Sequence, residues 1–244
     1  MDTEIQVLQL QCEDQSYIFP TLVSHDGELI LIDCGYEGQL EQLESELRRL
    51  GTTIEQLKAV VITHHDIDHM GGLCDLLTIN PSLKVMSSQI DSPYIEGKKT
   101  SLRLAQVREY NRNLDKEELE RGRAFEKLLQ GVKCCEVDVL LKEWSSPYPF
   151  FQVLATPGHM PGHISIYVPQ QKVLIAADAL IWENGKFEIA NPAFTLDLSA
   201  AIQSVAKILA LQPEKIICYH GGMVDKNISP LLQELIESYN AVQP

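Results

Sequence analysis

Residues 63–72 read THHDIDHMGG, with three histidines and two aspartates in the first seven positions and then two glycines. The stretch follows KAVVIT (58–63), a short apolar run typical of a buried strand, and it precedes GGLCDLL, which favours a helix. Imidazole and carboxylate groups are common ligands of divalent metal ions in proteins. The stretch therefore predicts a metal site and raises the question of which of the five side chains bind.

Other candidate ligands follow β-rich runs elsewhere in the chain. His159 comes after FFQVLATPG, Asp178 after KVLIAA and His220 after KIICY, just as His64 ends KAVVIT. A single histidine at a strand end is more often a hydrogen-bonded structural residue. Because strand ends at one edge of a sheet converge in space, four such ends together with the cluster predict one metal centre.

The motifs THHDIDHMGG, TPGHMPGH, AAD and YHGG, in this order, resemble the metallo-β-lactamase superfamily. The motif of that family is usually H-x-H-x-D-H, followed by distant His, Asp and His residues. The resemblance covers nearly the whole chain, and the set of motifs is far more specific than any one of them. It implies an α+β fold, a four-layer αββα sandwich with a dinuclear metal site at one edge of its sheets.

The resemblance also implies a role for each matching residue. The first metal would be held by His64 and His159, the second by Asp68, His69 and His220, and Asp178 would bridge the two. Asp178 stands where the true β-lactamases have cysteine, which points to hydrolase branches such as glyoxalase II-like thioesterases and lactonases. Two divalent ions are expected, zinc first, with manganese or iron as alternatives.

Asp66 departs from the family motif, which has histidine at this position. If the chain is extended here, residues 64, 66 and 68 share one face and residues 65 and 67 point the other way. Asp66 is then a metal ligand or an anchor of the first metal, and His65 is a neighbour of the site or a surface residue. The alternative is that Asp66 only caps the helix that begins near His69.

A carboxylate at position 66 changes the charge of the expected centre. Two divalent ions, three aspartates and one bridging hydroxide sum to zero, whereas a histidine at position 66 would leave one positive charge. A harder, neutral centre shifts the metal preference from zinc towards manganese or iron. The flavodiiron branch of the family has a carboxylate at this position and binds iron, but this sequence shows no flavodoxin-like domain.

The middle of the chain is polar and favours helices. Residues 96–131 predict a helical pair with a break near Asn113–Asp115. We expect a single domain over residues 1–244 with a helical insertion at about 94–132. This insertion is either a decoration of the fold or a lid over a pocket.

Composition limits the partners. The chain has 244 residues, is 45% hydrophobic and carries a formal net charge of −14. Such a charge disfavours nucleic acid, and no apolar run is long enough for a membrane span. The start of the sequence shows no signal peptide, so we expect a cytoplasmic protein whose six cysteines are reduced and mainly structural. The expected partner is a small-molecule substrate, and a homodimer stays open.

These features favour a metal-dependent hydrolase that uses a metal-bridging hydroxide on an ester, thioester or lactone. Asp68 is the candidate catalytic residue, because it can position the hydroxide or carry a proton to the leaving group. His163, four residues beyond His159, either contacts substrate, orients a ligand or makes a structural hydrogen bond. The alternatives are a phosphodiesterase, a β-lactamase and a non-hydrolytic metal-binding or iron redox protein on the same fold.

Overall fold

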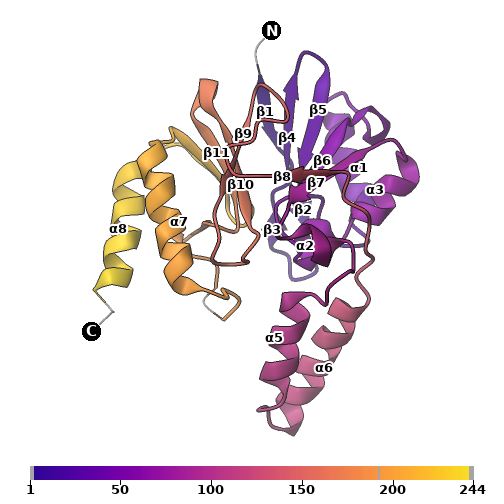
Figure 1. Cartoon of the computed structure of the whole chain (residues 1–244), viewed down its shortest axis with the longest axis vertical. Coiled ribbons are helices and arrows are strands. Elements are labelled where there is room, and N and C mark those ends of the chain that lie inside the picture. Colours follow the sequence, from indigo (N-terminus) through magenta and orange to yellow (C-terminus); the bar gives the residue numbers. More distant parts are fainter. Residues whose placement is uncertain (1–2, 192, 242–244) are drawn as a thin grey trace.

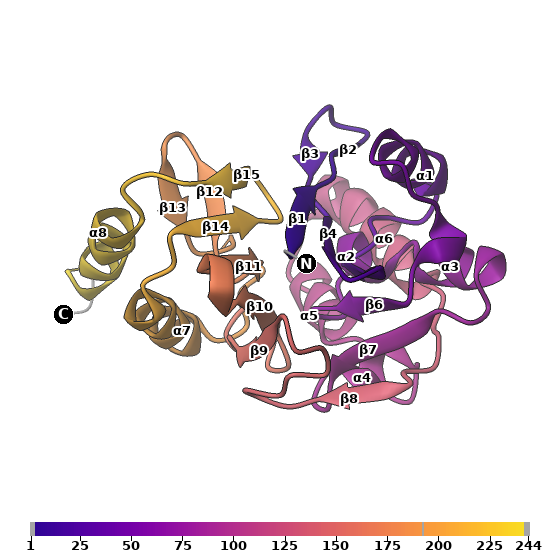
Figure 2. The same cartoon turned by 90° about the horizontal axis from the view of Figure 1, so that it is seen from above.

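The protein is a four-layer sandwich in which two β-sheets face each other and helices cover the outer face of each sheet (Figures 1 and 2). The computed structural model describes residues 3–191 and 193–241. This αββα arrangement confirms the fold class expected from the sequence.

The first sheet has six strands, and its outer face is covered by helices α1 (Leu40–Arg49) and α3 (Leu73–Ile79). Its central strands β5, β6 and β7 pair in parallel, whereas β1, β4 and β5 are antiparallel. In spatial order its strands are β1 (Glu4–Val7), β4 (Thr21–His25), β5 (Glu28–Ile32), β6 (Ala59–Ile62), β7 (Lys84–Ser88) and β8 (Val139–Leu141).

The second sheet has five strands, and its outer face is covered by helices α7 (Leu198–Leu211) and α8 (Ile228–Asn240). In spatial order its strands are β15 (Gly222–Val224), β14 (Lys215–Cys218), β11 (Val173–Ala177), β10 (Ile164–Val168) and β9 (Gln152–Ala155). Smaller elements are the pairs β2 (Leu10–Gln11) with β3 (Tyr17–Ile18) and β12 (Ile181–Glu183) with β13 (Lys186–Glu188), and the 3-10 helices Ile54–Gln56 and Pro169–Gln171.

The alternating directions of side chains along the apolar strands explain how the layers form. In β5, Ile30 and Ile32 pack between the sheets, while Leu31 packs under the helices of the first sheet. In β14, Ile217 faces the other sheet and Ile216 faces the helices. Successive strand residues point to opposite faces, so a continuous apolar run supplies both sides of a sheet that is buried on both faces.

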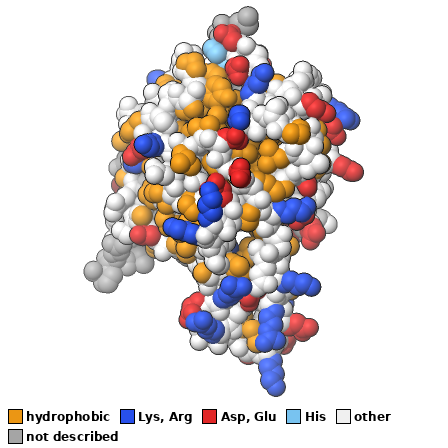
Figure 3. Space-filling view, turned by 45° about the vertical axis from the view of Figure 1, so that its right-hand side comes forward, with side chains coloured by type: hydrophobic (Ala, Val, Ile, Leu, Met, Phe, Trp, Pro, Cys, Tyr) orange, Lys and Arg blue, Asp and Glu red, His pale blue; other side chains and the backbone are white. Residues whose placement is uncertain are grey.

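A helical hairpin projects from one end of the sandwich (Figure 1). It consists of α5 (Leu102–Asn111) and α6 (Lys116–Gln130), and it is preceded by the short helix α4 (Ser92–Ile95). The Asp115 carboxylate accepts hydrogen bonds from two backbone N–H groups of α6, which fixes the break between the two long helices. Side chains of both charges cover the projecting end (Figure 3), as expected for a solvated helical face.

Two cysteines differ from expectation. Cys74 in α3 and Cys135, which follows α6, form a disulfide, so the prediction that all six thiols are reduced is wrong for this pair. The other four cysteines are free, and Cys34 and Cys218 are buried, as expected for structural residues. Among the helices of the described residues, none is both long enough and apolar enough to cross a membrane.

Candidate metal centre

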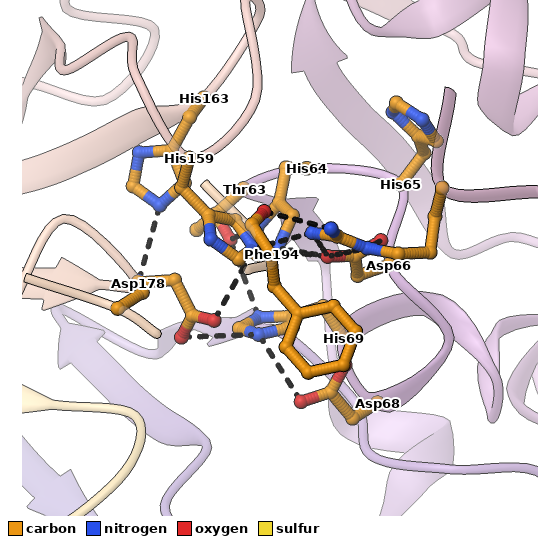
Figure 4. A network of polar contacts seen from close by, with 12 residues as sticks. Thr63, His64, His65, Asp66, Asp68, His69, His159, His163, Asp178 and Phe194 are labelled. Carbon is orange, nitrogen blue, oxygen red and sulfur yellow. Dashed lines mark hydrogen bonds and ion pairs between the residues drawn. The ribbon is translucent and has the colours of Figure 1, made fainter. Parts of the chain in front are cut away.

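The seven predicted ligands lie together at one edge of the two sheets, and Figure 4 labels six of them, all but His220. Their positions follow strand ends, because the chain leaves β6, β11 and β14 at this edge and also turns there between β9 and β10. From the loop after β6 and the short helix α2 (Ile67–Met70) come His64, Asp66, Asp68 and His69; from the second sheet come His159, Asp178 and His220. Two groups have ligand atoms within 4.8 Å of one another: His64, His159 and Asp178, and Asp68, His69 and His220.

The second group, with Asp178 added, has the geometry of a tetrahedral site. His69 Nε2 lies 3.3 Å from Asp178 Oδ1 and 3.5 Å from Asp68 Oδ2. His220 Nε2 lies 3.1 Å from Asp68 Oδ2 and 3.6 Å from Asp178 Oδ1. Ligand atoms about 2.0–2.1 Å from a tetrahedral zinc ion are roughly 3.3 Å apart, and these four distances match that spacing.

The hydrogen bonds around His69 also fit a metal. Its Nδ1 lies 2.9 Å from Asp33 Oδ2, so the buried carboxylate fixes the tautomer that leaves Nε2 with a bare lone pair. His69 Nε2 and Asp178 Oδ1 are buried without a hydrogen-bond partner among the described residues. Buried polar atoms are rarely left unpaired, so these two atoms fit a site that binds a cation.

The charges at this position favour a cation as well. Burial alone would lower the pKa of His69, but the negative charges of Asp68, Asp33 and Asp178 outweigh it and hold the pKa well above its usual range. For His220, burial is likewise outweighed, by Asp178 and Asp68, and its pKa is raised. The carboxylates therefore attract positive charge to these imidazoles, which a proton or a divalent ion can supply.

In the first group, His64 is the histidine whose ring has an unprotonated nitrogen without a hydrogen-bond partner. Thr63 Oγ1 donates its proton to Asp33 Oδ2, at 2.8 Å, and so accepts from His64 Nδ1, at 3.2 Å. Burial, followed by the positive charge of His69, holds the pKa of His64 well below its usual range, so the ring is neutral. Its Nε2 has no hydrogen-bond partner in the described structure and is available to bind a metal.

Asp66 faces the metal centre, but it is paired with Arg103 from α5. Arg103 Nη2 donates to Asp66 Oδ2 at 2.6 Å, and Nε donates to Asp66 Oδ1 at 3.1 Å. The same Oδ2 lies 2.9 Å from His159 Nε2 and 3.5 Å from His64 Nε2. Burial would raise the pKa of Asp66, but its close contacts with His159 and His64 and the charge of Arg103 outweigh it and keep the pKa well below its usual range.

The capping alternative for Asp66 is not what the structure shows. Asp66 occupies the N-cap position of α2, but its carboxylate makes no capping hydrogen bond to the described helix. The expected extended backbone ends earlier than position 68, because α2 begins at Ile67. Asp68 therefore reaches the centre from a helix and not by strand alternation, while Asp66 lies on the expected face.

His65 is a buried neighbour of the site, one of its two expected places, and not a surface residue. Its Nδ1 lies 2.8 Å from Asp91 Oδ2, and its Nε2 accepts a hydrogen bond from the backbone N–H of Leu102 at 3.2 Å. The adjacent residues His65 and Asp66 therefore hold the adjacent residues Leu102 and Arg103 at the start of α5. This double contact positions Arg103 at the metal centre.

His163 and a strand irregularity place Asp178. His163 Nε2 accepts the backbone N–H of Asp178 at 3.1 Å, and its Nδ1 lies 2.8 Å from Thr156 Oγ1. The pairing of β11 with β14 shifts register between Ile175 and Ala177, which turns the end of the strand toward the site. Burial, with a smaller effect of His159, lowers the pKa of His163 to about 3, so it is a neutral structural acceptor.

Sequence reasoning missed two residues of this centre. Asp33 appears in ELILIDCG at the end of a strand, the same signal that marked His64 and Asp178, and that signal predicts a side chain at this edge. Arg103 had no such signal, because it lies in a helix with several other charged residues. The charge count made from the sequence omitted Arg103, so it was too low by one positive charge.

A pocket of about 420 Å³ opens onto the candidate ligands. Asp66, Asp68, His159, Asp178 and His220 form part of its lining. Much of the rest is apolar, and α6 contributes three of the apolar residues: Phe125, Leu128 and Leu129. The hairpin therefore forms one wall of the cavity that leads to the metal centre.

Comparisons with known proteins give a matching family model and a curated relative. The family model of the metallo-beta-lactamase superfamily matches residues 15–131 and 148–220. A Bacillus subtilis protein, probable metallo-hydrolase YflN, is 26% identical over 243 residues, covering 92% of this chain and 87% of its own.

Two solved structures share the fold. The metallo-beta-lactamase family protein TTHA1429 from Thermus thermophilus superposes with a TM-score of 0.77 at 21% identity, over 97% of this chain and 79% of its own. The metallo-beta-lactamase superfamily protein ST1585 from Sulfolobus tokodaii gives 0.69 at 20% identity, over 98% of this chain and 87% of its own.

Proposed function

The chain belongs to the metallo-β-lactamase superfamily, and from this we propose that it is a metal-dependent hydrolase of a carboxylic ester, thioester or lactone with an apolar acyl group. One observation carries the proposal: the candidate ligands lie in the lining of a pocket that has an apolar wall from α6. Apolar pockets with a few convergent polar groups are typical of small-molecule sites.

The residues divide the chemistry between them. When bound, a divalent ion such as zinc would polarise the carbonyl group and lower the pKa of a water molecule. Asp68, His69, Asp178 and His220 would hold that ion, and Asp68 would also accept a proton and pass it to the leaving group. The apolar side chains Phe125 and Leu128 would bind the acyl chain and exclude water from it.

Other substrates fit the pocket less well. A phosphodiester would meet an apolar wall on a chain with a net charge of −14. A β-lactam would meet Asp178 at the position where the true β-lactamases have cysteine. The glyoxalase II-like and lactonase-like branches share that aspartate, so we assign the activity to one of them.

Hydrolysis of a substrate panel tests the proposal. Zinc-loaded protein is assayed with p-nitrophenyl esters of increasing chain length, an acyl thioester, an acyl lactone and bis-p-nitrophenyl phosphate. We expect turnover of one or more acyl compounds and loss of roughly a hundredfold or more in rate for Asp178→Asn. Asp91→Asn is the matched control, because Asp91 is also buried and bonded to a histidine but lies outside the ligand set.

The panel also decides between reaction classes. Cleavage of the phosphodiester alone would assign the protein to the phosphodiesterases. Failure of zinc, manganese and iron forms to cleave any compound, with oxygen or peroxide consumed by the iron form, would replace the hydrolase by a redox protein.

A further inference from the structure

The candidate ligands form two cation positions: the first lies at His64, Asp66 and His159, and the second lies between Asp68, His69, Asp178 and His220. Arg103 brings a permanent positive charge into the first position. It is almost fully buried, at 3% exposure, although it lies in the helical hairpin and not in the sandwich. Its Nη2 contacts two atoms that a first metal would need, Asp66 Oδ2 at 2.6 Å and His159 Nε2 at 3.1 Å. A buried guanidinium needs a compensating carboxylate, and Asp66 supplies it.

The guanidinium is held on all sides. All three of its nitrogens have polar partners: Nε and Nη2 donate to Asp66, Nη2 also lies 3.1 Å from His159 Nε2, and Nη1 donates to Gln106 and to the backbone oxygen of Phe194. Its central carbon lies 5.0 Å from the centre of the Phe194 ring. Gln106 is fixed in turn by a hydrogen bond to the backbone oxygen of Ala193, at 2.9 Å. These contacts fix the guanidinium group in one position and orientation.

The hydrogen bond to His159 sets up a competition. A neutral imidazole has one bare nitrogen with one in-plane lone pair. His159 Nε2 lies 3.1 Å from Arg103 Nη2 and 2.9 Å from Asp66 Oδ2, so it either accepts from the guanidinium or donates to the carboxylate. In either state this nitrogen has no lone pair free for a metal ion. The Oδ2 atom of Asp66 is shared in the same way between the guanidinium and the first cation position.

The second position has no such competitor. Within the described chain, no lysine or arginine forms an ion pair with Asp68 or Asp178, whose partners there are His69, His159 and His220. Its donor atoms also have the spacing of a tetrahedral zinc site. The two positions therefore differ in what a metal ion must displace.

We propose that the Arg103 guanidinium occupies the first cation position, so that the chain binds one divalent ion tightly between Asp68, His69, Asp178 and His220. A second ion binds weakly, because it must displace Arg103 from Asp66 and His159. The inference rests on the metal centre of the proposed function but not on its substrate or reaction. It also explains why an aspartate is tolerated at position 66: the guanidinium restores the positive charge that a carboxylate there removes.

Zinc binding to the whole chain tests this directly. Metal-free wild type, Arg103→Met and Arg108→Met are titrated by calorimetry, and metal content is measured after reconstitution and gel filtration. We expect one tight ion in the wild type, with the second roughly tenfold or more weaker, and two tight ions in Arg103→Met. Arg108→Met should behave like the wild type, because Arg108 lies on the same helix but pairs with Glu126 at the surface.

Three outcomes would overturn the inference: two equally tight ions in the wild type, an Arg103→Met protein that matches the wild type, or one that binds less metal. The last would mean that Arg103 orients the ligands and does not compete with the ion. If Arg103→Met does not fold, an anomalous-scattering map of zinc-loaded wild type decides. Zinc at the second position with Arg103 still paired to Asp66 supports the inference, and full zinc occupancy at both positions contradicts it.

These measurements need no substrate. One tight ion in the wild type and two in Arg103→Met would support the inference even if the substrate panel showed no turnover. An active hydrolase with two equally tight ions would keep the proposed function and reject the competition.

Discussion

His69 illustrates how much of this centre depends on single buried contacts. Asp33 accepts hydrogen bonds from the backbone N–H and hydroxyl of Thr63 and from His69 Nδ1, so its position is fixed by the end of β6. Tyr219 stacks on the imidazole ring of His69, with centroids 3.9 Å apart. The imidazole thus keeps one orientation and one tautomer, which lowers the entropy cost of binding a metal.

Loss of the Asp33 charge should weaken metal binding at the second position. We expect Asp33→Asn to lower zinc affinity by roughly 10- to 100-fold, because an amide binds His69 Nδ1 less strongly and leaves Nε2 a poorer ligand. Competition with a chromogenic chelator measures the affinity. Asp91→Asn, which weakens the corresponding bond to His65, should leave this affinity unchanged; an equal loss in both variants would point to general destabilisation.

Proton release is a second prediction for these residues. The raised pKa values of His69 and His220 mean that, without metal, these rings hold protons to a higher pH than ordinary histidines do. A metal ion needs their bare nitrogens, so its affinity should fall as pH falls and rise as pH rises toward these raised pKa values.

Calorimetry checks the sign of this effect. Zinc titrations near neutral pH in two buffers of different ionisation enthalpy should give different apparent enthalpies, corresponding to roughly one proton or more released per ion. Equal enthalpies in the two buffers would show that both rings are already neutral.

Among the elements, α6 adds specificity to a centre built by the sandwich. Its first residues are polar and capped by Asp115, whereas its last two turns present Phe125, Leu128 and Leu129 to the pocket. Leu128 remains 52% exposed and lies in the pocket lining beside Phe125, which suits a surface that binds an apolar ligand. The element therefore supports the lid hypothesis by its position, and the lid role itself remains a prediction.

Truncation of this wall should remove selectivity for long acyl chains. If the proposed hydrolase activity holds, kcat/KM of the wild type should rise by about fourfold for each methylene group that is buried against α6. Phe125→Ala and Leu128→Ala should flatten this dependence and leave the rate with an acetyl ester nearly unchanged. Leu119→Ala, on the same helix but outside the pocket lining, is the control; a flattened profile there would reject the assignment of the wall.

For the whole molecule, the centre joins the two halves of the sandwich. Asp68 and His69 follow the first sheet, whereas Asp178 and His220 follow the second. An ion bound to all four therefore links chain segments that otherwise meet through the apolar layer between the sheets.

Metal removal should destabilise the fold as a whole. Zinc at about a thousand times its dissociation constant should add about 4 kcal/mol to the free energy of unfolding, if it binds only the folded chain. For a chain of this size that corresponds to roughly 10 °C in Tm. Thermal melting with and without a chelator measures the shift.

Two histidine substitutions, one at the centre and one away from it, provide the control for this experiment. His220→Ala should lose most of the zinc-dependent shift, because it removes the donor that follows β14. His25→Ala should keep it, because His25 contacts Thr3 and Phe150 away from the centre. The same shift in both variants would place the stabilising ion elsewhere.

The sequence by itself determined the layers and the group of candidate ligands. Alternation in runs such as ELILI and the leucine spacing of α1 act within one segment, so they predict which face is buried without knowledge of the neighbours. Strand ends marked His64, His159, Asp178 and His220, because a polar residue after an apolar run must lie at a sheet edge. The same signal was present for Asp33.

Only the tertiary structure decided what surrounds those ligands. The pair Asp66–Arg103 joins residues 37 positions apart, and the contact of Asp33 with His69 spans 36. Such contacts depend on how separate elements pack, and the local pattern of α5 does not distinguish Arg103 from its charged neighbours. The physical reason is that periodicity orients a side chain relative to its own segment, whereas the partner of a buried charge is fixed only when another segment is packed against it.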